Sequence, residues 1–551
     1  MKKYQIFTLF IVFIIQGTLG FAANTRDTIA KVKFNKIQGV NYQGAEYVSY
    51  LKEAKTYILG NDMEKGVSLL SNGINGVFRQ TKIERVLPYN VAELFSLISY
   101  ASTKELSKNE KQAAYFFIKA IFLEKKPSDK AFKAVLEKAP NTIFIRRFKV
   151  LVGVFSNDST IINDVDKLIK EAPTLVNLNF LKAQNLYDAN KYEECITYCN
   201  NVVGLSPEYA IAYQLRGKCY YELNKLSEAL TDYNTAIQLF PEYNEVVYER
   251  AVVYLDLKKY TEAIAGFKLI NRLNPSYKWN SYNLSRAYKY HAMADSALHF
   301  IGLHIKQNPD DADGYDIKGD IYYDRNEYNT AISLYTQSIQ LEPDEHRFYE
   351  SRGNAYYYAD SVDKAKKDFG KALELDANND YVLSRLGDCY YRDKDYEQSL
   401  TYYKRAIEID SNDKYSYVSL NTTYTHLKRY KDAVDAALKA IKIDSTYSSA
   451  LGNLGWTYYC YGKYDECIKY SSLAIKQDAT ASYARFNLAL ATLRKGDFEK
   501  AKKLYASYVK ICLDNKYKIN DGAVTDLNDL VEKKILVKEC NFIIKNIIPG
   551  K

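Results

Sequence analysis

The 551-residue chain lacks the residue patterns on which most active sites and metal sites are built. It has five histidines, and its eight cysteines form no C-x-x-C pair, which argues against a zinc ribbon and a thioredoxin-like site. It also has no G-x-x-x-x-G-K-[ST] phosphate loop, no G-x-S-x-G turn and no H-E-x-x-H helix. The sequence therefore predicts a protein that is not an enzyme, with no cofactor and no small-molecule substrate.

A metal site is worth considering only at His291, His299 and His304, which share one stretch with Asp295. Imidazole and carboxylate groups are common metal ligands. However, no two of these histidines are four residues apart, and we expect a helix break near Met293 to separate His291 from the others. We therefore predict no metal site.

Long hydrophobic runs are absent after residue 25, so no later segment is expected to span a membrane. The start of the chain differs, because Lys2 and Lys3 precede an apolar run, Ile6–Ile15, and small residues follow near Ala23. This order is typical of a secretory signal peptide over residues 1–23, and an uncleaved membrane anchor is the alternative. We expect an exported protein, either periplasmic or secreted.

Charge of one sign is not concentrated in any block. The formal net charge is +9, but acidic residues are interleaved with the basic ones along the whole chain. This distribution predicts no nucleic-acid partner. Tyrosine is the unusual residue of the composition, with 53 copies against two tryptophans, so many rings are available for surfaces.

The strongest pattern in the sequence is a period of 34 residues. Steps of 34 give a column of mostly small residues: Ala183, Gly217, Ala251, Ser285, Gly319, Gly353, Gly387, Asn421, Gly455 and Ala489. Three residues later runs a mostly aromatic column: Leu186, Tyr220, Tyr254, Tyr288, Tyr322, Tyr356, Tyr390, Tyr424, Tyr458 and Thr492. A fixed period of about 20 to 50 residues indicates a stacked repeat array.

Each unit has the pattern of two short helices. In the unit of Gly319, apolar residues at helical spacing predict one helix over 315–325 and a second over 327–341. A second small column is expected to face the first, so that the helices approach closely while the tyrosine column fills the gap: Ala229, Ala263, Ala297, Ala331, Ala365, Ala433 and Ala501. Proline or aspartate is expected to end each second helix: Pro207, Pro241, Pro275, Pro309, Pro343, Asp376, Asp410, Asp444 and Asp478.

At these columns the sequence resembles the tetratricopeptide repeat family, although the tryptophan often found early in the first helix of that family is absent. The resemblance implies an all-α fold, a right-handed superhelical solenoid of 34-residue helix-turn-helix repeats. It also implies a concave groove that binds other proteins, and it implies no chemistry.

The repeat pattern weakens at both ends of the chain. We expect an irregular helical region with degenerate repeats over residues 24–141, the repeat array over 142–515, and a C-terminal capping helix and tail over 516–551. A capping helix is predicted over Asp521–Val537, because a solenoid must cover its last apolar surface.

Several cysteines stand at repeat positions that are apolar in other units. Cys195 and Cys467 replace alanine, and Cys199 replaces an aromatic residue. We expect buried thiols that act as small apolar side chains. A Cys199–Cys219 disulfide is the alternative, since exported proteins meet oxidising compartments.

In the resembled family the groove is lined by the first helix of each unit. The resemblance assigns these residues to a partner-binding groove: Trp279, Tyr282, Arg286, Asp313, Asp316, Asp320, Tyr323, Asp324, Arg347, Glu350, Asn354, Tyr357, Asp388, Tyr391, Trp456 and Tyr459. A solvated polar face is the alternative for any one of them. The clamp for chaperone tails is absent, because Glu350 replaces its lysine beside Asn354.

The unit of Gly319 places four carboxylates on one expected face: Asp313, Asp316, Asp320 and Asp324. Like charges at this spacing destabilise a helix, so they are either used in binding or neutralised by Lys318, Arg325 and Arg347. We predict a non-enzymatic scaffold of the cell envelope that binds a protein or an extended peptide, and this segment is basic or amide-rich if the acids are used in binding. The alternatives are a glycan- or peptidoglycan-binding envelope protein and, as the weakest, an enzyme with an unrecognised site in residues 24–141.

Overall fold

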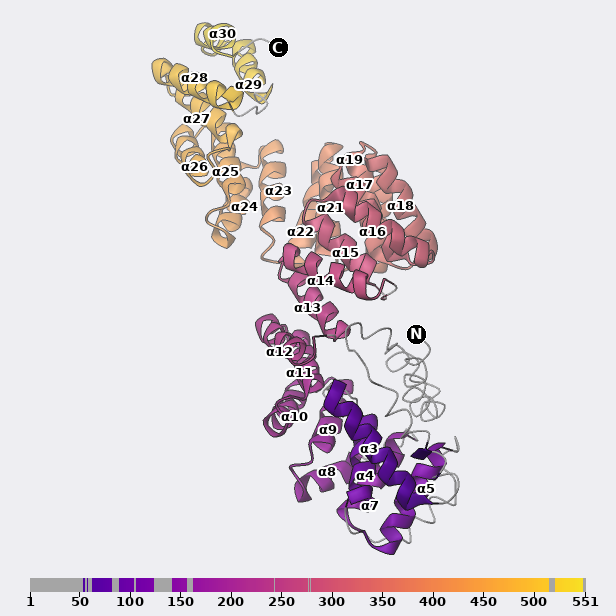
Figure 1. Ribbon diagram of the computed structural model, residues 1–551. Helices are drawn as coiled ribbons and strands as arrows, with labels where there is room; N and C mark the ends of the chain where they lie inside the picture. Colours follow the sequence, from indigo (N-terminus) through magenta and orange to yellow (C-terminus); the bar gives the residue numbers. More distant parts are fainter. Residues whose placement is uncertain are drawn as a thin grey trace. The chain divides into compact units, whose positions relative to one another are not determined.

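The computed structural model describes residues 53, 54, 57, 62–81, 89–103, 106–122, 141–155, 162–241, 243–275, 277, 279–514 and 521–548. These residues form 27 helices, which follow one another in pairs (Figure 1). The predicted all-α repeat fold is confirmed. The chain divides into two compact parts, residues 1–300 and 301–551, with the division inside α16. The predicted signal peptide, residues 1–23, lies outside the described residues.

The first part holds α3 (Met63–Thr81), α4 (Tyr89–Thr103), α5 (Lys108–Phe122), α7 (Ile143–Phe155) and α8 (Ile162–Glu171). Helix pairs follow: α9 (Val176–Asp188) with α10 (Tyr192–Leu205), α11 (Ala210–Glu222) with α12 (Leu226–Leu239), α13 (Asn244–Asp256) with α14 (Tyr260–Leu273), and α15 (Asn280–Tyr290) with the start of α16 (Ala294–Gln307).

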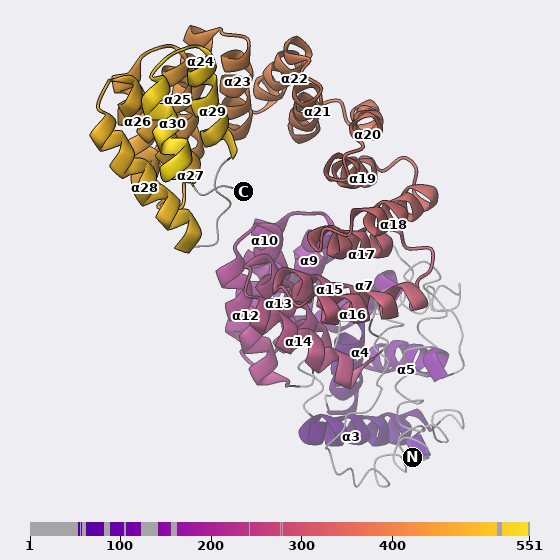
Figure 2. The same ribbon diagram turned by 90° about the horizontal axis from the view of Figure 1, so that it is seen from above.

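The second part continues with α17 (Ala312–Asp324) and α18 (Tyr328–Leu341), α19 (His346–Tyr358) and α20 (Val362–Leu375), α21 (Asp380–Arg392) and α22 (Tyr396–Ile409), α23 (Lys414–His426) and α24 (Tyr430–Ile443), α25 (Ser448–Cys460) and α26 (Tyr464–Gln477), and α27 (Ser482–Arg494) and α28 (Phe498–Asp514). Two further helices, α29 (Asp521–Glu532) and α30 (Val537–Asn546), end the chain. From above, α17 to α22 are visible as three successive pairs (Figure 2).

The turn between the two helices of a unit has the same conformation ten times over. One residue in each of these turns has a positive φ: Asn190, Asn224, Lys258, Ala292, Asn326, Asp360, Lys394, Lys428, Gly462 and Gly496. At the end of α21, for example, the amide of Lys394 donates to Tyr391 O and the amide of Asp395 donates to Tyr390 O. This bonding pattern is a Schellman motif, which uses carbonyls that the helix end would otherwise leave unpaired.

Packing inside a unit differs from the sequence prediction. The small column of the first helix meets the large residue of the second helix directly, since a Cβ added at Gly319 would lie 2.6 Å from Cε1 of Tyr335. Gly353 stands in the same way against Phe369, and Gly387 against Tyr403. The second small column is buried, as expected, but it is not the nearest neighbour of the first.

Part of the tyrosine column that was expected to fill this gap is less buried than predicted, whereas Tyr288 and Tyr424 of the same column are buried. Tyr322 and Tyr356 are only half-buried, whereas Tyr335, Phe369 and Tyr403 are at most 2% exposed. The large side chains that fill the space beside Gly319, Gly353 and Gly387 therefore come from the second helix. The reason is geometric, because glycine in the first helix opens a space that only an inward residue of the facing helix can fill.

The ends of the second helices agree with the prediction. Helices α10, α12, α14, α16 and α18 each end two residues before a proline of the 34-residue column. Later units use aspartate at the cap position, where Asp444 Oδ1 accepts from the amide of Thr446 at 3.0 Å. Hydrogen bonds from Lys414 and Thr446 lower the pKa of Asp444 to about 2.

The helices before the regular array are tied to it by a buried ion pair. Glu93 of α4 accepts two bonds from Arg147 of α7, at 2.6 and 2.9 Å, and one from Asn177 of α9 at 2.9 Å. Both charged side chains are at most 9% exposed. Three helices that are distant in sequence therefore meet at one carboxylate.

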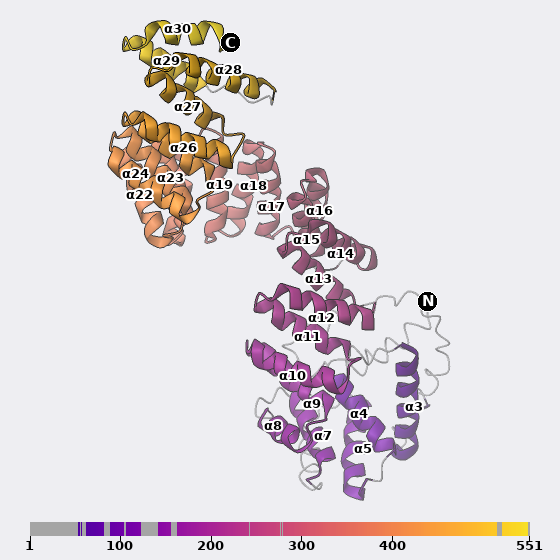
Figure 3. The same cartoon turned by 90° about the vertical axis from the view of Figure 1, so that its left-hand side faces the viewer.

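The C-terminal helices are shorter than predicted and more numerous. The helix expected over Asp521–Val537 ends at Glu532, and α30 follows it. Figure 3 shows α28, α29 and α30 grouped at this end, where Leu527, Leu530 and Ile543 join one apolar cluster. Within the part of the chain that the structure describes, no helix is both long enough and apolar enough to cross a bilayer.

All eight cysteines are free thiols, and seven of them are buried. Sγ of Cys195 lies 3.9 Å from Sγ of Cys199 inside the first part. The preferred interpretation, buried thiols at apolar repeat positions, therefore describes this structure, and the Cys199–Cys219 disulfide does not. Burial raises the pKa of Cys389 to about 12, so this thiol stays protonated at neutral pH.

Candidate partner-binding face

The residues predicted to line a groove fall in both parts of the chain, and each part is described by itself. In the second part the relevant helices are α17, α19 and α21. We call the following polar and aromatic side chains of these helices the α17–α21 face: Asp313, Asp316, Asp320, Tyr323, Asp324, Arg347, Glu350, Asn354, Tyr357, Tyr358, Tyr381, Arg385, Asp388, Tyr391 and Arg392. Helix α19 contacts both α17 and α21, so this face is continuous from helix to helix.

The acidic residues of α17 do not share one exposed surface, contrary to the prediction. Asp316 is only 9% exposed, and its Oδ1 has no hydrogen-bond partner among the described residues. Asp320 accepts a 2.9 Å bond from the hydroxyl of Tyr335, so this acid also belongs partly to the packing of the unit. Asp313 and Asp324 are more exposed. Of the four carboxylates that the spacing places on one face, Asp316 is therefore buried and Asp320 takes part in the packing of the unit.

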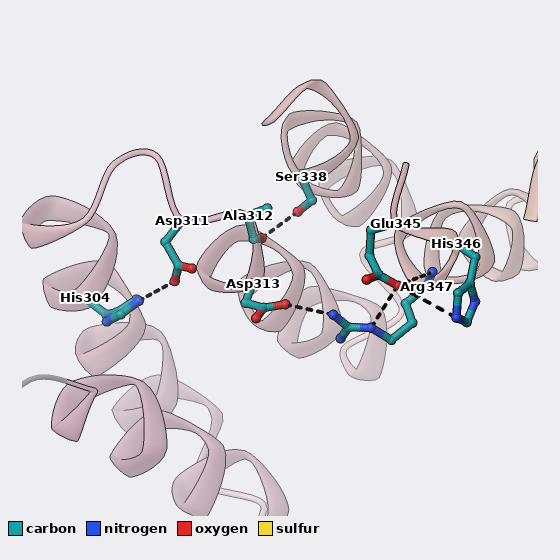
Figure 4. Close-up of polar contacts among 8 residues, drawn as sticks. All are labelled: His304, Asp311, Ala312, Asp313, Ser338, Glu345, His346 and Arg347. Atoms are coloured by element: carbon teal, nitrogen blue, oxygen red, sulfur yellow. Dashed lines mark hydrogen bonds and ion pairs between the residues drawn. The ribbon is translucent and has the colours of Figure 1, made fainter. Parts of the chain in front are cut away.

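Burial controls the chemistry of Asp316. Desolvation and the nearby Asp320 carboxylate raise the pKa of Asp316 to about 8, while Ser351 and Arg347 act in the opposite direction. Arg347 is engaged elsewhere, because it bonds to Asp313 at 3.3 Å and to Glu345 at 3.1 Å (Figure 4). One arginine therefore links the start of α19 to α17 without reaching the buried carboxyl group.

The start of α17 is held by His304, which the sequence pattern marked only as a candidate metal ligand. His304 is 2% exposed, and its Nε2 lies 2.5 Å from Oδ2 of Asp311, the residue before the helix (Figure 4). Ser338 of α18 donates to the carbonyl of Ala312 at 2.9 Å. No group of three or more potential metal ligands occurs among the described residues. Through its contact with Asp311, His304 positions the start of α17.

Tyrosines form the centre of the face. The rings of Tyr323 and Tyr358 meet edge to face at 5.8 Å between centroids, and Tyr328 of α18 stacks on Tyr358 at 5.9 Å. Tyr357 packs edge-on against Tyr358 at 5.4 Å. Tyr358 and Tyr381 remain 51% and 47% exposed, so this cluster presents apolar ring surface to solvent.

An arginine lies beneath these rings. The guanidinium of Arg385 is 4.5 Å from the centroid of Tyr357 and 5.5 Å from that of Tyr358. It donates to Asn354 Oδ1 at 2.9 Å and to Asp388 Oδ2 at 2.7 Å, while its Nη2 is buried without a partner among the described residues. Aromatic and arginine side chains gathered in this way are the usual anchors of binding surfaces.

Sequence reasoning missed Arg385, although a signal was present. Residues two places before the small column are mostly apolar or small and polar, and only Glu249 and Arg385 are charged there. Both charged side chains are only partly exposed and belong to polar networks: in the first part Glu249 bonds to Lys218 at 2.9 Å, and desolvation raises the pKa of Glu249 to about 7. A charge at an otherwise uncharged repeat position was therefore the clue.

Other predicted groove residues have different surroundings. Trp279 precedes α15 rather than lying on it, with φ 64° and its ring edge-on to Tyr282 at 5.8 Å, and Arg286 lies 5.8 Å from the Tyr282 ring. Tyr391 meets Tyr396 at 5.5 Å in the second part. In the first part, Trp279, Tyr282 and Arg286 are therefore neighbours of one another.

Trp456 and Tyr459 stand closer to the C-terminal helices. The two rings stack at 5.3 Å and pack against the apolar cluster that includes Leu527 and Leu530 of α29. Burial raises the pKa of Tyr459, and the Asp526 carboxylate of α29 contributes to this rise. Burial also raises the pKa of Asp526 itself to about 6. This end of the array is therefore partly covered by the chain itself.

Comparison with known proteins agrees with this architecture. Models of the family described as TPR repeat match residues 217–258 and 319–360, and two models described as tetratricopeptide repeat match 346–379 and 381–413. No curated protein matches the chain. None of the matched models describes a catalytic domain.

Three solved structures illustrate the likeness. YrrB, described as a TPR protein with an unusual peptide-binding site, is 22% identical over 33% of this chain and 95% of its own, with a TM-score of 0.29. A tetratricopeptide repeat protein from Parabacteroides merdae is 19% identical over 44% and 97%, with a TM-score of 0.38. PilF from Pseudomonas aeruginosa is 16% identical over 38% and 96%, with a TM-score of 0.34.

Helix pairs at a fixed period, the repeated turn and the matched repeat models all point to the same family. Residues 217–258, 319–379 and 381–413 of the chain are similar to tetratricopeptide repeats.

Proposed function

We propose that the protein is a non-catalytic scaffold that binds a protein or an extended peptide through the first helices of its repeats. Proteins of this family bind protein or peptide partners, and stacked repeats provide the extended surface for it. The observation that carries the proposal here is the tyrosine cluster over Arg385, because it combines half-exposed rings with an arginine anchor.

A basic segment is the favoured occupant near α17. Asp313, Glu345 and Glu350 gather there around Arg347, and Asp316 lies beneath them. Charge complementarity would steer a cationic partner to this side of the α17–α21 face, so its association should slow as the salt concentration rises.

Site-specific photocrosslinking in the native cell tests the proposal. A benzophenone amino acid replaces exposed Tyr381, and the matched control carries it at Leu473, which is 36% exposed on the second helix α26. We expect a protein adduct at position 381 and none at position 473. Equal labelling at the two positions, or no adduct at position 381, contradicts the proposal.

An exported location belongs to the same proposal. It is supported by the composition of residues 1–23, where two lysines, an apolar run and small residues follow in order. N-terminal sequencing of the protein from its own cells should find a chain that starts near Phe21 or Ala23. Recovery of an intact Met1 on a membrane-bound protein favours the uncleaved anchor instead.

Glycan or peptidoglycan binding is the second candidate. The observation that favours it is Tyr415, which is 64% exposed and offers a ring face for stacking on a sugar. A carbohydrate pull-down beside the protein crosslinking separates the two functions. Retention on peptidoglycan that is lost in Tyr415→Ala supports the glycan alternative.

A further inference from the structure

Two buried polar atoms on the α17–α21 face lack hydrogen-bond partners among the described residues, and they have opposite chemistry. One is Oδ1 of Asp316 on α17, and the other is Nη2 of Arg385 on α21. Buried polar groups in folded proteins are nearly always paired, so each exception needs an explanation. A partner that supplies both missing contacts would provide one.

The surroundings of Asp316 favour a cation. Asp313 and Asp320 of the same helix face it, and Arg347 and Ser351 face it from α19. Arg347 is held by Asp313 and Glu345, with half of its side chain exposed, and its charge does not outweigh the desolvation of Asp316 and the nearby Asp320 carboxylate, which keep the pKa of Asp316 raised. A lysine or arginine side chain from a partner would bring positive charge to a place where carboxyl groups predominate.

The surroundings of Arg385 favour an uncharged group. Its positive charge is already matched by Asp388, whose second oxygen accepts from the hydroxyl of Tyr403 at 2.7 Å. Nearby Arg392 is matched in the same way by Asp360. A carboxylate from a partner would therefore meet two balanced pairs and the electron-rich faces of Tyr357 and Tyr358, with no cation left for it.

We propose that the α17–α21 face binds an extended segment with a basic side chain at Asp316 and a neutral carbonyl, from the main chain or from an amide, at Arg385. An acidic side chain is rejected at the second place. Two helix-to-helix steps of roughly 10 Å separate α17 from α21, so about six residues of extended chain join the two contacts. This inference rests on the proposed function and names the chemistry of its partner.

A displayed library of random twelve-residue peptides is the probe. It is selected against the full-length protein, Asp316→Asn, Arg385→Lys and the control Arg405→Gln, an exposed arginine on the second helix α22. Wild type and control should enrich peptides with a basic residue and, about six residues away, no acidic one. Asp316→Asn should lose the basic preference, and Arg385→Lys should lower affinity for the enriched peptides at least tenfold, because lysine lacks the planar fork.

Calorimetry of the most enriched peptide adds a readout that a purely structural role would not change. Since burial raises the pKa of Asp316, a cation bound there should release a proton, and the heat should depend on the buffer for wild type but not for Asp316→Asn. Circular dichroism and melting show whether each variant is folded. If Arg385→Lys fails to fold, Tyr381→Ala, at a half-exposed position, replaces it in the selection.

The outcomes separate this inference from the function on which it rests. No enrichment by wild type overturns both. Enrichment with an acidic residue at the second place, the same basic preference in Asp316→Asn, or binding by wild type without proton release overturns this inference alone and leaves peptide binding intact.

Discussion

Gly353, which packs against Phe369, and Gly370, which follows Phe369 in the chain, should respond in opposite ways to replacement by alanine. A Cβ at Gly353 of α19 would lie 2.7 Å from Cε1 of the buried Phe369 ring, whereas a Cβ at Gly370 of α20 would meet no atom within 4 Å. Alanine in a helix interior is more favourable than glycine by about 1 kcal/mol. Gly370→Ala should therefore stabilise the unit by about 1 kcal/mol.

Gly353→Ala gains the same helix propensity, but its Cβ must push the Phe369 ring aside or move α19 away from α20. Overpacking of a tight core costs about 1–3 kcal/mol. The net effect should be a loss of about 1 kcal/mol, which places the two variants about 2 kcal/mol apart. Adding Phe369→Leu should recover part of the loss, with a coupling energy of at least about 0.5 kcal/mol. One unit of the chain already carries such a paired exchange. At the positions of Gly353 and Phe369 it has the larger Asn421 and the smaller Ala437.

Native-state hydrogen exchange of the α19 and α20 amides is the suitable assay. Repeats interact mainly with their neighbours, so the effect should centre on these helices and fade toward α27. A guanidinium melt gives the overall change. If Gly353→Ala protects the amides as well as Gly370→Ala does, the close contact with Phe369 carries no energetic weight and the packing scheme is wrong.

Three further predictions concern the turns, the N-terminal helices and pH. Lys394→Gly should raise the melting temperature, because a residue with a side chain costs about 1–2 kcal/mol in the left-handed conformation and glycine does not. For the same reason Gly462→Ala should lower the melting temperature. Glu93→Gln should destabilise the first part by about 3–5 kcal/mol, since it leaves Arg147 buried without its counter-charge; a loss below about 1 kcal/mol in denaturant melts would show that water replaces the carboxylate. The pKa of Asp316 is raised from 3.8 to about 8, so the folded state holds this proton more tightly than the unfolded state, and stability should fall as pH rises between these values. Asp316→Asn should remove that slope from melting curves recorded from pH 4 to 8, and an unchanged slope would assign it to another group.

The sequence alone determined the period, the helix pairs and the helix ends. Small residues 34 places apart, and a proline or aspartate after each second helix, follow from local rules of helix formation and termination. These rules depend only on residues that are a few positions apart in the sequence. They therefore hold whatever the neighbouring units do, and the bounds of α10 to α28 agree with them.

Tertiary packing decided which side chains are buried, and the sequence could not supply this. Asp316, Asp320 and Asp324 have similar spacings on α17, yet the first is buried, the second accepts from Tyr335, and the third is exposed. Arg385 acquires its tyrosine surroundings only because α19 lies against α21. Helical periodicity gives the direction of a side chain from its own axis, whereas burial depends on the neighbouring helix that covers it.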